Sequence, residues 1–556
     1  MAETTAPFAF DEGTIRKRQR SLDQVRKKLK QDFVGIDGIV DELCNYVRIW
    51  YLMPEVLTRP VIVNLWGMTG VGKTDLVRKL VSSLGIQDRF CEVELGGDYQ
   101  NQTVAGFLAS GGIDDGEPAI VLFDEVQRFS TRNPDGTDKD NGGKFADFWE
   151  LLSDGRLARR DRNSINYLTR ERLQQMEYDR EYRKRNPNPD DPTDPSKAEI
   201  GIWEARNIIN VSGMKADPAE VAKWTLERLE KEIRAVKTSK KVYEPVDHSR
   251  TLCIISGNLD EAFAMAAQAS EADVDADIFS AYTRKISVVD VKNALLQRFR
   301  PEQVARFGNI HLIYRSLRRR DFEMLISREV ERVGARVNAL FNVTVSVDPS
   351  VNALIYRNGV FPVQGVRPVF SSVIDILETN LTGFLFEAIM AKASSIALSY
   401  DTGANQLIAK LGTSVVKRLP FTGRIDNIRQ SNRPDVTANV AVHEAGHAVV
   451  YSALYGLAPL QLTAKVASSY AAGFTFPHQI HETKDNLISR IKVLLAGGLA
   501  EDLVFGEGNA SVGRITDREQ ATMTTIDVIR RYGFDHEFQA AVHHGGPVLH
   551  GPDGNR

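Results

Sequence analysis

Hydrophobic and polar positions alternate at helical spacing over about the first 50 residues, with a break at Phe33-Val34-Gly35. Short apolar runs then appear at 61–65, 90–95, 119–123 and 251–256. Short buried runs that alternate with helical patterns are typical of βαβ units, in which the strands are parallel. We therefore predict an α/β fold with a parallel sheet and helices on both of its faces.

The rest of the chain divides by the same patterns into smaller units. Helical stretches and two strand-like runs between 310 and 411 predict a compact mixed α/β unit. A polar segment separates this unit from a mainly helical one that holds eight of the ten histidines. We expect a large domain over 1–300 with a charged insertion over about 160–248, a small domain over 301–411, a linker over 412–435 and a last domain over 436–556.

Composition and charge exclude several classes of protein. The 70 basic and 73 acidic residues give a net charge of -3, whereas nucleic-acid binders usually carry a basic excess, so we expect no nucleic-acid partner. The three cysteines, Cys44, Cys91 and Cys253, lie far apart among apolar neighbours, which predicts buried thiols rather than disulfides. The N-terminus lacks a signal-peptide pattern, and no stretch approaches the roughly 20 apolar residues of a membrane helix. We therefore predict a cytoplasmic protein without membrane insertion.

A glycine-rich loop directly follows the first predicted strand and opens a helix with apolar spacing. The loop comprises Gly67, Met68, Thr69, Gly70, Val71, Gly72, Lys73 and Thr74. In such a loop, backbone N–H groups and the helix N-terminus bind phosphate oxygens, a lysine neutralises the β- and γ-phosphates, and a hydroxyl ligates magnesium. The pattern therefore predicts a site for ATP and Mg²⁺, with Lys73 and Thr74 in those two roles.

Two carboxylates end the apolar run at 119–123, about 50 residues after this loop. Asp124 at the strand end can hold the hydrated magnesium, and Glu125 can polarise the attacking water. Two acids after a strand are weak evidence alone. Their position after a phosphate-binding loop makes them strong evidence for ATP hydrolysis.

These motifs resemble the AAA+ superfamily, and more closely its Clp branch of unfoldases, over about residues 1–411. Ser256-Gly257-Asn258 looks like the end of the sensor-1 strand, and the resemblance implies that Asn258 helps to orient the water. The segment RPEQVAR at 300–306 looks like the one that ends in the arginine finger, which implies that Arg306 acts on the ATP of a neighbouring subunit. A finger that acts between subunits implies a ring, and the resemblance implies a homo-hexamer.

The same resemblance implies two further nucleotide contacts. Gly365-Val366-Arg367-Pro368 looks like the sensor-2 motif of the small lid domain, which would place Arg367 near the γ-phosphate of its own subunit's ATP. Val34 and Gly35 fall where the family contacts adenine.

Two features depart from the Clp pattern. Clp unfoldases carry an aromatic residue flanked by glycine in the pore loop, whereas the matching residues 109–116 offer Ile113 as the apolar candidate for gripping substrate. The insertion is more than the family pattern requires, and it is either a solvated decoration or a docking element for an adaptor or substrate.

A second chemical motif, His443-Glu444-Ala445-Gly446-His447, lies in a predicted helix over 441–454. Histidines four residues apart share one helical face, about 6 Å apart, where both imidazoles can bind one zinc ion. Glu444 lies beside them, where it can take a proton from the attacking water, as in peptide hydrolysis. A hydrolytic zinc site needs a third protein ligand, for which spacing alone leaves open Asp517, Glu501, Asp502, His478 and His481.

The last domain resembles the FtsH family of zinc metallopeptidases. The resemblance rests on HEAGHAVV, AGFTFP, LLAGGLAEDLVFG and TDREQAT, which begin at 443, 472, 494 and 516. It implies that Asp517 is the third zinc ligand and that AAGFTFP is an edge strand along which an extended substrate lies. FtsH proteins also carry N-terminal membrane helices, their own kind of AAA+ motor and further C-terminal helices, and this chain departs from that pattern.

Two functions from different classes fit these motifs. The first is an ATP-dependent zinc metalloprotease, in which a ring motor delivers unfolded or tagged polypeptide to the fused peptidase, with ATP, Mg²⁺ and Zn²⁺ as cofactors. The second is a remodelling ATPase or chaperone whose last domain binds zinc without cutting, which the short peptidase segment and the non-aromatic pore loop motivate. A nucleic-acid-dependent motor is disfavoured by the charge balance. We predict the first function, because it accounts for both sites.

Overall fold

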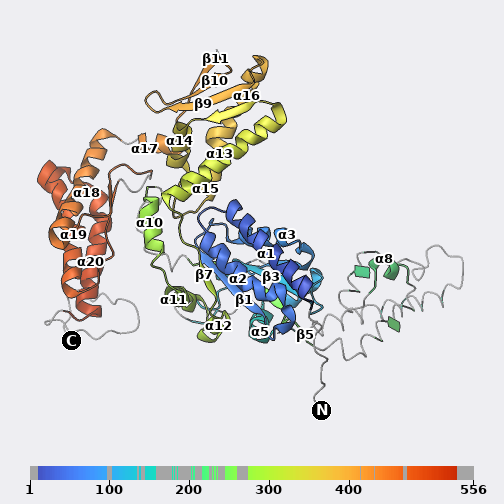
Figure 1. Cartoon of the computed structure of the whole chain (residues 1–556). Coiled ribbons are helices and arrows are strands. Elements are labelled where there is room, and N and C mark those ends of the chain that lie inside the picture. Colours follow the sequence, from blue (N-terminus) through green and yellow to red (C-terminus); the bar gives the residue numbers. More distant parts are fainter. Residues whose placement is uncertain are drawn as a thin grey trace. The chain divides into compact units, whose positions relative to one another are not determined.

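The computed structural model describes residues 11–96, 103–133, 137–139, 145–157, 216–224, 245–259, 273–413, 415–430, 433–467 and 473–534, and isolated positions between 174 and 235. The chain forms two compact units (Figure 1). Unit 1 comprises Met1–Ala262 and Ile286–Arg315, and unit 2 comprises Phe263–Lys285 and Ser316–Arg556. The chain therefore enters unit 2 at residue 263, returns to unit 1 at residue 286, and enters unit 2 again at residue 316.

Unit 1 is built on a five-stranded parallel sheet. Its strands, in the order β2-β3-β6-β1-β7, are β1 (Val61–Gly67), β2 (Phe90–Glu94), β3 (Ala119–Asp124), β6 (Thr251–Asn258) and β7 (His311–Ile313). Every pairing in this sheet is parallel, with Gly67 opposite Asn258 at the end of β1 and β6. The predicted parallel sheet is confirmed. Because parallel strands end at one edge, the order brings the loop after β1, the acids after β3 and the end of β6 together.

The central strands are apolar on both faces, as expected for a sheet covered on both sides. The polar exception in β1 is Asn64, which is buried and donates to the carbonyls of Phe307 and Ile310 at 2.7 and 2.8 Å. These two bonds tie β1 to the chain just before β7, so the polar group stabilises the edge of the sheet rather than weakening its core.

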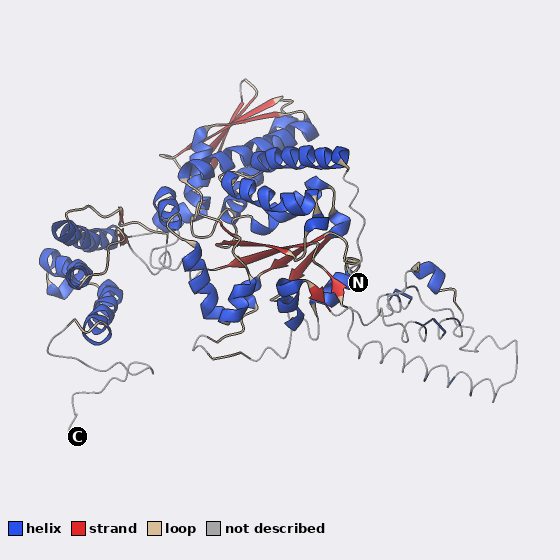
Figure 2. Cartoon of the chain, turned by 60° about the horizontal axis from the view of Figure 1, so that its bottom comes forward, coloured by secondary structure: helices blue, strands red, loops and turns tan. Residues whose placement is uncertain are grey.

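Helices lie on both faces of the sheet (Figure 2). They are α1 (Glu12–Asp32), α2 (Asp37–Leu52), α3 (Lys73–Leu84), α4 (Val104–Ser110), α5 (Ala146–Asp154), α11 (Val288–Arg298) and α12 (Pro301–Arg306). The predicted helix break at 33–35 is confirmed, with Gly35 at a φ of 77° between α1 and α2. Buried aromatic rings pack together between the sheet, α5, α11 and α12: Phe123, Phe129, Phe148, Trp149, Phe299 and Phe307.

The insertion of unit 1 begins and ends at a short antiparallel pair, β4 (Arg156–Leu157) and β5 (Val246–Asp247). Within it, α8 (Pro218–Val221) is capped by the Asp217 carboxylate, which accepts from the Ala219 N–H. A small apolar cluster contains Ala205, Ile209, Ala216, Val221, Ala222 and Trp224. Apart from these residues and a few isolated positions, the insertion lies outside the described residues.

The first part of unit 2 is a mixed α/β domain, called the lid below. Its sheet has the order β11-β10-β9-β8, with β8 (Thr344–Val347), β9 (Ser395–Asp401), β10 (Gln406–Leu411) and β11 (Val415–Pro420). Its helices are α13 (Arg319–Phe341), α14 (Pro349–Gly359), α15 (Arg367–Ser372) and α16 (Thr379–Met390), with the π-helix η7 (Val373–Glu378) between the last two. Unit 2 also contains α10 (Ala276–Thr283).

The segment predicted as a linker contains regular structure. β11 pairs with β10 and extends the lid sheet past residue 411, and α17 (Arg424–Gln430) follows it. Likewise β7 joins the sheet of unit 1 beyond residue 300. Both segments form strands because each pairs with a neighbouring strand. The sequence of the segment alone does not reveal such pairing. The predicted domain borders themselves stay predictions.

Among the described residues, one helix is long and apolar enough, by length and composition alone, to cross a membrane, which the sequence analysis did not anticipate. It runs through α15, η7 and α16 from Arg367 to Met390, with a mean hydropathy of 1.3 in its most apolar window. Its buried side chains, among them Leu377, Leu381 and Leu385, lie where the helix packs on α13, α14, β9 and β10. A core helix of a small domain passes the same test, so this single helix is weak evidence for a membrane span.

The C-terminal part of unit 2 is mainly helical, as predicted (orange to red in Figure 1). It contains α18 (Pro434–Tyr455), α19 (Lys484–Phe505), α20 (Ile515–Ile526), the π-helix η10 (Asp527–Arg531) and the antiparallel strands β12 (Gln461–Thr463) and β13 (Phe474–Phe476). Helices α18 and α19 cross closely at Gly446, where a Cβ would lie 2.6 Å from Ala500 Cβ. This glycine therefore permits the helix crossing that forms the second site below.

Candidate functional site

Side chains from the ends of β1, β3 and β6 meet at one edge of the sheet in unit 1. Lys73, which is buried, donates from Nζ to Gly67 O, Met68 O and Asn258 Oδ1 at 3.1, 2.8 and 2.7 Å. Thr74 Oγ1 donates to Asp124 Oδ2 at 2.7 Å. The structure thus brings together Lys73, Thr74, Asp124 and Asn258, four of the residues predicted for the nucleotide site.

The loop before Lys73 has the backbone that phosphate binding requires. Gly70 and Gly72 have φ angles of 76° and 84°, in the left-handed region that favours glycine. A Cβ on Gly67 would lie 2.7 Å from Tyr314 Cβ, so glycine also permits the close approach to the chain after β7. The loop leads straight into the N-terminus of α3, which favours an anion. Loop, lysine, hydroxyl and carboxylate together fit a triphosphate with magnesium.

Glu125, the predicted catalytic acid, is held by its neighbours. Its φ of 54° is unusual for a residue other than glycine. Its Oε2 accepts from Gln127 Nε2 at 2.6 Å and pairs with Arg128 Nε at 3.1 Å. Gln127 Oε1 in turn accepts from the Asn258 N–H at 2.9 Å. Gln127 therefore joins Glu125 to Asn258, a connection that the sequence analysis missed because nothing in the motif marks this glutamine.

Three other predicted contacts can be located but not tested. The ring of Phe33 lies beside Gly72, 3.6 Å from where a Cβ would stand, so segment 33–35 borders the phosphate loop, and the adenine contact of Val34 and Gly35 stays a prediction. Arg306 ends α12 and donates to Trp149 O at 2.9 Å, and its action on a neighbouring subunit also stays a prediction. Arg367 begins α15 in unit 2, and its role toward the ATP stays a prediction as well.

Ile113, the apolar candidate for gripping substrate in the predicted pore loop, is buried. This side chain is 1% exposed, and its N–H donates to Leu108 O at 3.0 Å in the turn after α4. A side chain buried in unit 1 cannot grip a polypeptide. The turn folds Ile113 inward toward the buried end of α4, which a short apolar–polar pattern does not reveal.

In the C-terminal part of unit 2, the three predicted zinc ligands converge. The ligand atoms of His443, His447 and Asp517 lie within 4.8 Å of one another. His443 Nε2 lies 3.0 Å from Asp517 Oδ2 and 3.0 Å from His447 Nε2, and His447 Nε2 lies 3.4 Å from the same Asp517 oxygen. The histidines come from α18 and the aspartate from the first turn of α20.

The outer ring nitrogens indicate which tautomers the two imidazoles adopt. His447 Nδ1 lies 2.7 Å from Val493 O, which only accepts, so this nitrogen carries a proton. His443 Nδ1 lies 2.6 Å from Glu501 Oε1 and donates to that carboxylate. When both rings are neutral, the two Nε2 atoms therefore present lone pairs toward each other, which is unfavourable unless a proton or a metal ion lies between them. Zn–N bonds at a tetrahedral angle put two nitrogens about 3.3 Å apart, so the site fits zinc.

The charges around the ligands favour a cation. Burial lowers the pKa of His443, but its hydrogen bonds to Asp517 and Glu501 outweigh burial and raise it overall. Burial likewise acts to raise the pKa of Asp517, but the bonds from both histidines lower it to about 2. Asp517 is thus ionised, and its negative charge beside both imidazoles favours a cation at this position.

Helix α19 supplies space and orientation rather than a ligand. A Cβ on Gly497 would lie 2.4 Å from His447 Nε2 and 2.6 Å from His443 Nε2. Glu501, fully buried four residues later, also accepts from the N–H and hydroxyl of Ser511 at 2.6 and 3.0 Å. Glu501, left open as a ligand by spacing, is therefore the carboxylate that orients His443.

The remaining ligand candidates have other positions. Asp502 pairs with Arg514 at 2.8 Å, and His478 Nδ1 lies 3.3 Å from the Tyr451 hydroxyl. His481 is exposed in the segment before α19. Among the described residues, the three-ligand group is His443, His447 and Asp517, which leaves a fourth tetrahedral position open for chemistry.

Glu444 lies buried beside the ligands, next to the strand pair β12–β13. Thr475 of β13 donates from its hydroxyl to Glu444 Oε2 at 2.8 Å. Burial raises the pKa of Glu444, and the Thr475 bond opposes that rise. A Cβ on Gly473 would lie 2.9 Å from Glu444 Cγ, so the chain entering β13 runs against this side chain. The predicted strand is confirmed over 474–476, while residues 471 and 472 lie outside the described residues.

Comparison with known families agrees with this geometry. Residues 432–546 match Peptidase family M41. The match contains His443, His447 and Asp517 together with Glu444. We call residues 432–546 the M41 segment.

The curated relatives are similar to the M41 segment and its surroundings. ATP-dependent zinc metalloprotease FtsH 2 of Symbiobacterium thermophilum is 38% identical over 105 residues, which are 18% of this chain and 18% of the relative. FtsH of Haemophilus influenzae is 33% identical over 119 residues, which are 21% of this chain and 18% of the relative. The YME1 subunit of the Saccharomyces cerevisiae mitochondrial i-AAA protease is 32% identical over 97 residues, which are 17% of this chain and 13% of the relative. The chain thus spans less than a fifth of the length of these relatives.

Solved structures of Hsp104 share a broader likeness. A closed state with ATPyS and FITC casein matches with a TM-score of 0.42 and 14% identity, covering 72% of this chain and 53% of that one. The S. cerevisiae Hsp104–ADP complex matches with a TM-score of 0.40 and 14% identity, covering 69% of this chain and 52% of that one.

Proposed function

We propose that the chain is an ATP-dependent zinc metalloprotease, in which ATP hydrolysis in unit 1 delivers polypeptide to the M41 segment for cleavage. The observation that carries the proposal is the convergence of His443, His447 and Asp517 beside the buried Glu444. A zinc ion bound there would polarise the scissile carbonyl and lower the pKa of water. The curated relatives that match the M41 segment carry this activity in their names.

The residues of the M41 segment have separate tasks in this proposal. The two histidines and Asp517 hold the metal and leave one position open. Glu444 takes a proton from the attacking water and returns it to the leaving amine, a task for which a pKa raised by burial is suited. Thr475 fixes the Glu444 carboxylate, and β13 offers its backbone to an extended substrate.

In unit 1, the proposal assigns ATP hydrolysis to the cluster at the sheet edge. Lys73 turns from its own loop toward the β- and γ-phosphates, while Thr74 and Asp124 hold magnesium. Glu125 and Asn258 orient the attacking water, and Gln127 sets the distance between them.

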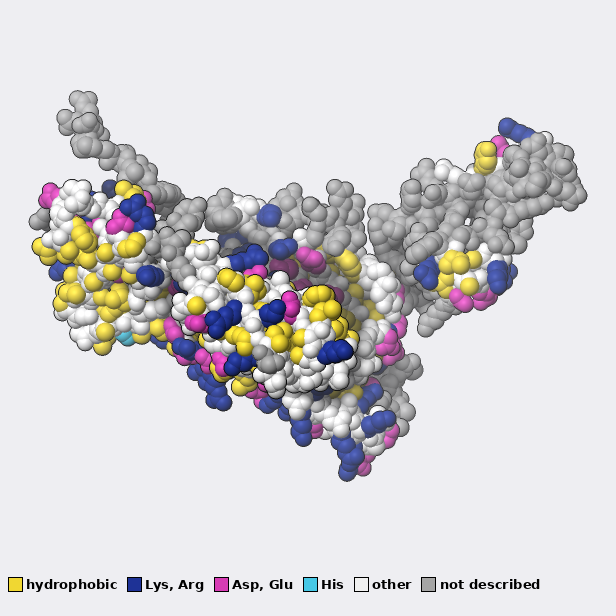
Figure 3. All heavy atoms as spheres, turned by 90° about the horizontal axis from the view of Figure 1, so that it is seen from above, with side chains coloured by type: hydrophobic (Ala, Val, Ile, Leu, Met, Phe, Trp, Pro, Cys, Tyr) yellow, Lys and Arg dark blue, Asp and Glu magenta, His cyan; other side chains and the backbone are white. Residues whose placement is uncertain are grey.

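A homo-hexamer in the cytoplasm, acting on unfolded or tagged polypeptides, belongs to the same proposal. Figure 3 shows hydrophobic side chains gathered over the helices of the M41 segment. The most exposed include Val449, Leu499, Leu503 and Val504, at 68, 64, 87 and 58%. Clustered apolar side chains on a surface mark association sites, and a second copy of the chain would cover them. In such a ring Arg306 would act on the neighbouring subunit's ATP.

The test uses two variants with one assay. A fluorescein-labelled unfolded protein is incubated with the full chain, ATP, Mg²⁺ and Zn²⁺. Glu444→Gln should slow cleavage by about 100-fold or more, the contribution of a general base, while ATP turnover continues. Exposed Glu507→Gln, on the same segment, should behave as wild type.

Glu125→Gln separates the motor from the peptidase. It should abolish ATP turnover and the cleavage of folded substrates, yet leave the cleavage of short peptides. If wild type turns over ATP but leaves every substrate as intact as Glu444→Gln does, the protease proposal fails and the remodelling ATPase replaces it. If Glu125→Gln cuts folded substrates as fast as wild type, the coupling of the motor to the peptidase fails instead.

A further inference from the structure

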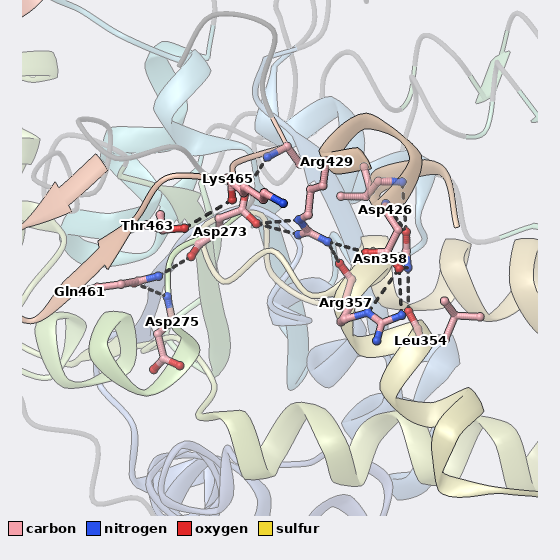
Figure 4. Close-up of polar contacts among 12 residues, drawn as sticks. Asp273, Asp275, Leu354, Arg357, Asn358, Asp426, Arg429, Gln461, Thr463 and Lys465 are labelled. Atoms are coloured by element: carbon pink, nitrogen blue, oxygen red, sulfur yellow. Dashed lines mark hydrogen bonds and ion pairs between the residues drawn. The ribbon is translucent and has the colours of Figure 1, made fainter. Parts of the chain in front are cut away.

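A partly buried ion pair joins two distant segments of unit 2 (Figure 4). Arg429 of α17 donates from Nε and Nη2 to Asp273 Oδ1 at 2.9 and 2.7 Å. Their side chains are only 20% and 12% exposed, although the residues are 156 positions apart. Neither residue belongs to the nucleotide or the metal site.

On one side, this pair is fixed to the lid. Arg429 Nη1 donates to Arg357 O at the end of α14 and to Asp426 Oδ1, at 2.9 and 3.0 Å. Asp426 Oδ2 accepts from Arg357 Nη2 and Asn358 Nδ2 at 3.1 and 3.0 Å. The side-chain oxygen Asn358 Oδ1 also accepts from the Asp426 N–H at 3.0 Å, so both ends of the Asn358 side-chain amide hold α17 to α14.

On the other side, the pair holds β12 of the M41 segment. Asp273 Oδ2 accepts from the Ala467 N–H at 2.6 Å. Gln461, the first residue of β12, donates from Nε2 to Asp273 O at 2.7 Å and accepts from the Asp275 N–H at 2.9 Å. Strand β12 pairs with β13, whose Thr475 holds Glu444. An unbroken set of contacts therefore runs from the lid through Arg429 and Asp273 to the predicted general base.

The route of the chain gives Asp273 a link to the nucleotide site. Asp273 lies in the excursion that leaves unit 1 after Asn258 and returns to it before Arg306. Asn258 contacts Lys73, and Arg306 is the predicted finger. The excursion thus connects, through the covalent chain, the nucleotide site with the segment that holds β12.

The energetics of a partly buried ion pair favour a positioning role over a stabilising one. The desolvation of both charges roughly cancels their attraction, so such pairs contribute little net stability. What the pair does supply is a fixed register, because a displaced partner leaves a largely desolvated charge uncompensated. Asp273 is satisfied when Arg429, Ala467 and Gln461 all stand in their present positions.

We propose that the Asp273–Arg429 pair couples the nucleotide state of unit 1 to the strand pair β12–β13, and so positions that pair beside Glu444. Asp273, Arg429 and Gln461 are positioning residues in this role. The inference rests on the proposed function, since it assumes that nucleotide binds in unit 1.

The experiment measures hydrogen exchange of the β12 and β13 amides in the full chain, with and without a non-hydrolysable ATP analogue and Mg²⁺. In wild type, the analogue should change exchange in 461–463 and 474–476 by about fivefold or more, the usual size of an allosteric coupling. Asp273→Asn and Arg429→Gln should each remove this response, and the double variant should be no worse than either. Arg433→Gln is the matched control, because Arg433 pairs with Asp435 on the surface nearby, with side chains 76% and 62% exposed.

A second readout is the cleavage of a short peptide, whose dependence on the analogue should disappear in the same two variants. An unchanged response in Asp273→Asn, or no response in wild type with the analogue bound, would overturn the coupling. Zinc content and thermal unfolding are measured for each variant, and loss of the response only together with zinc would show a merely structural pair and overturn it too. Binding of the analogue is measured separately, by displacement of a fluorescent nucleotide. If the analogue does not bind, the proposed function is contradicted and this inference fails with it.

Discussion

The polar groups of the nucleotide site satisfy one another, whereas those of the metal site do not. Lys73 contacts the carbonyls of its own loop and Asn258, and Thr74 contacts Asp124. In the M41 segment, two imidazole nitrogens face each other at 3.0 Å, and only a cation, whether a proton or a metal ion, makes that approach favourable. When nucleotide and magnesium bind, Lys73 and Thr74 must therefore give up hydrogen bonds within the protein and form new ones to the ligand. The metal site is preorganised, because Glu501 and Val493 hold the imidazoles from behind.

The largest effect should come from filling the preorganised site. Gly497→Ala would place a Cβ within 2.4 and 2.6 Å of the two ligating nitrogens, so zinc affinity should fall by more than about 100-fold. Competition with a metallochromic chelator measures that affinity. The control is Gly508→Ala, where a Cβ would meet no described heavy atom within 4 Å. Zinc affinity near that of wild type in Gly497→Ala would place the metal elsewhere.

The nucleotide site should respond differently, because its contacts are exchangeable. Asn258→Ala removes one acceptor from Lys73 and leaves the Gly67 and Met68 carbonyls. ATP hydrolysis should fall by about 100-fold, since the water loses an orienting group, while ATP affinity changes little. Steady-state turnover and titration with a fluorescent nucleotide separate the two quantities.

The control for that substitution is Asn309→Ala, whose amide contacts Lys292 on the surface. If Asn258→Ala loses binding and turnover together, the asparagine supports the loop rather than the reaction, and the contrast with the metal site disappears.

A weaker effect should follow from disturbing the support behind a ligand. Glu501→Gln keeps the shape of the side chain but replaces the carboxylate that accepts from His443 Nδ1. Zinc affinity should fall by about 10- to 100-fold, the usual result for a group that orients a ligand. The chelator assay is the same, with exposed Glu507→Gln as the matched control. Equal affinities of the two variants would mean that the helix backbone alone orients His443.

In both sites, the sequence predicts the functional residues that lie in a single structural element, because that element alone fixes their separation. Residues 67–74 span one strand–loop–helix turn, and His443 and His447 share one helical face, so local geometry alone determines their chemistry. Asp517 is 74 residues from His443 and belongs to another helix, and only resemblance to a family selects it from five candidates.

The parts that sequence does not predict depend on how elements pack. Gly497 and Glu501 act because α18 and α19 cross at Gly446, and Gln127 acts because β3 and β6 are neighbours. The same reason explains two further features that the sequence does not reveal. Ile113 is buried by the turn after α4, and β11 becomes a strand because β10 pairs with it. Motifs locate reactive groups, whereas packing decides which neighbours tune them.

The smallest predicted effect tests how finely the M41 segment tunes Glu444. Burial raises the pKa of Glu444, and the hydrogen bond from Thr475 lowers it. Because cleavage requires the carboxylate, activity is present above this pKa and is lost as the pH falls through it. Thr475→Val removes the bond that stabilises the carboxylate, so the pKa should rise further. The acid limb of kcat/KM for a short peptide should then move to higher pH, by up to about one unit, with the plateau nearly unchanged. The control is Thr522→Val, whose hydroxyl bonds Arg518 O on an exposed part of α20, and a limb that moves equally in both variants would contradict the role given to Thr475.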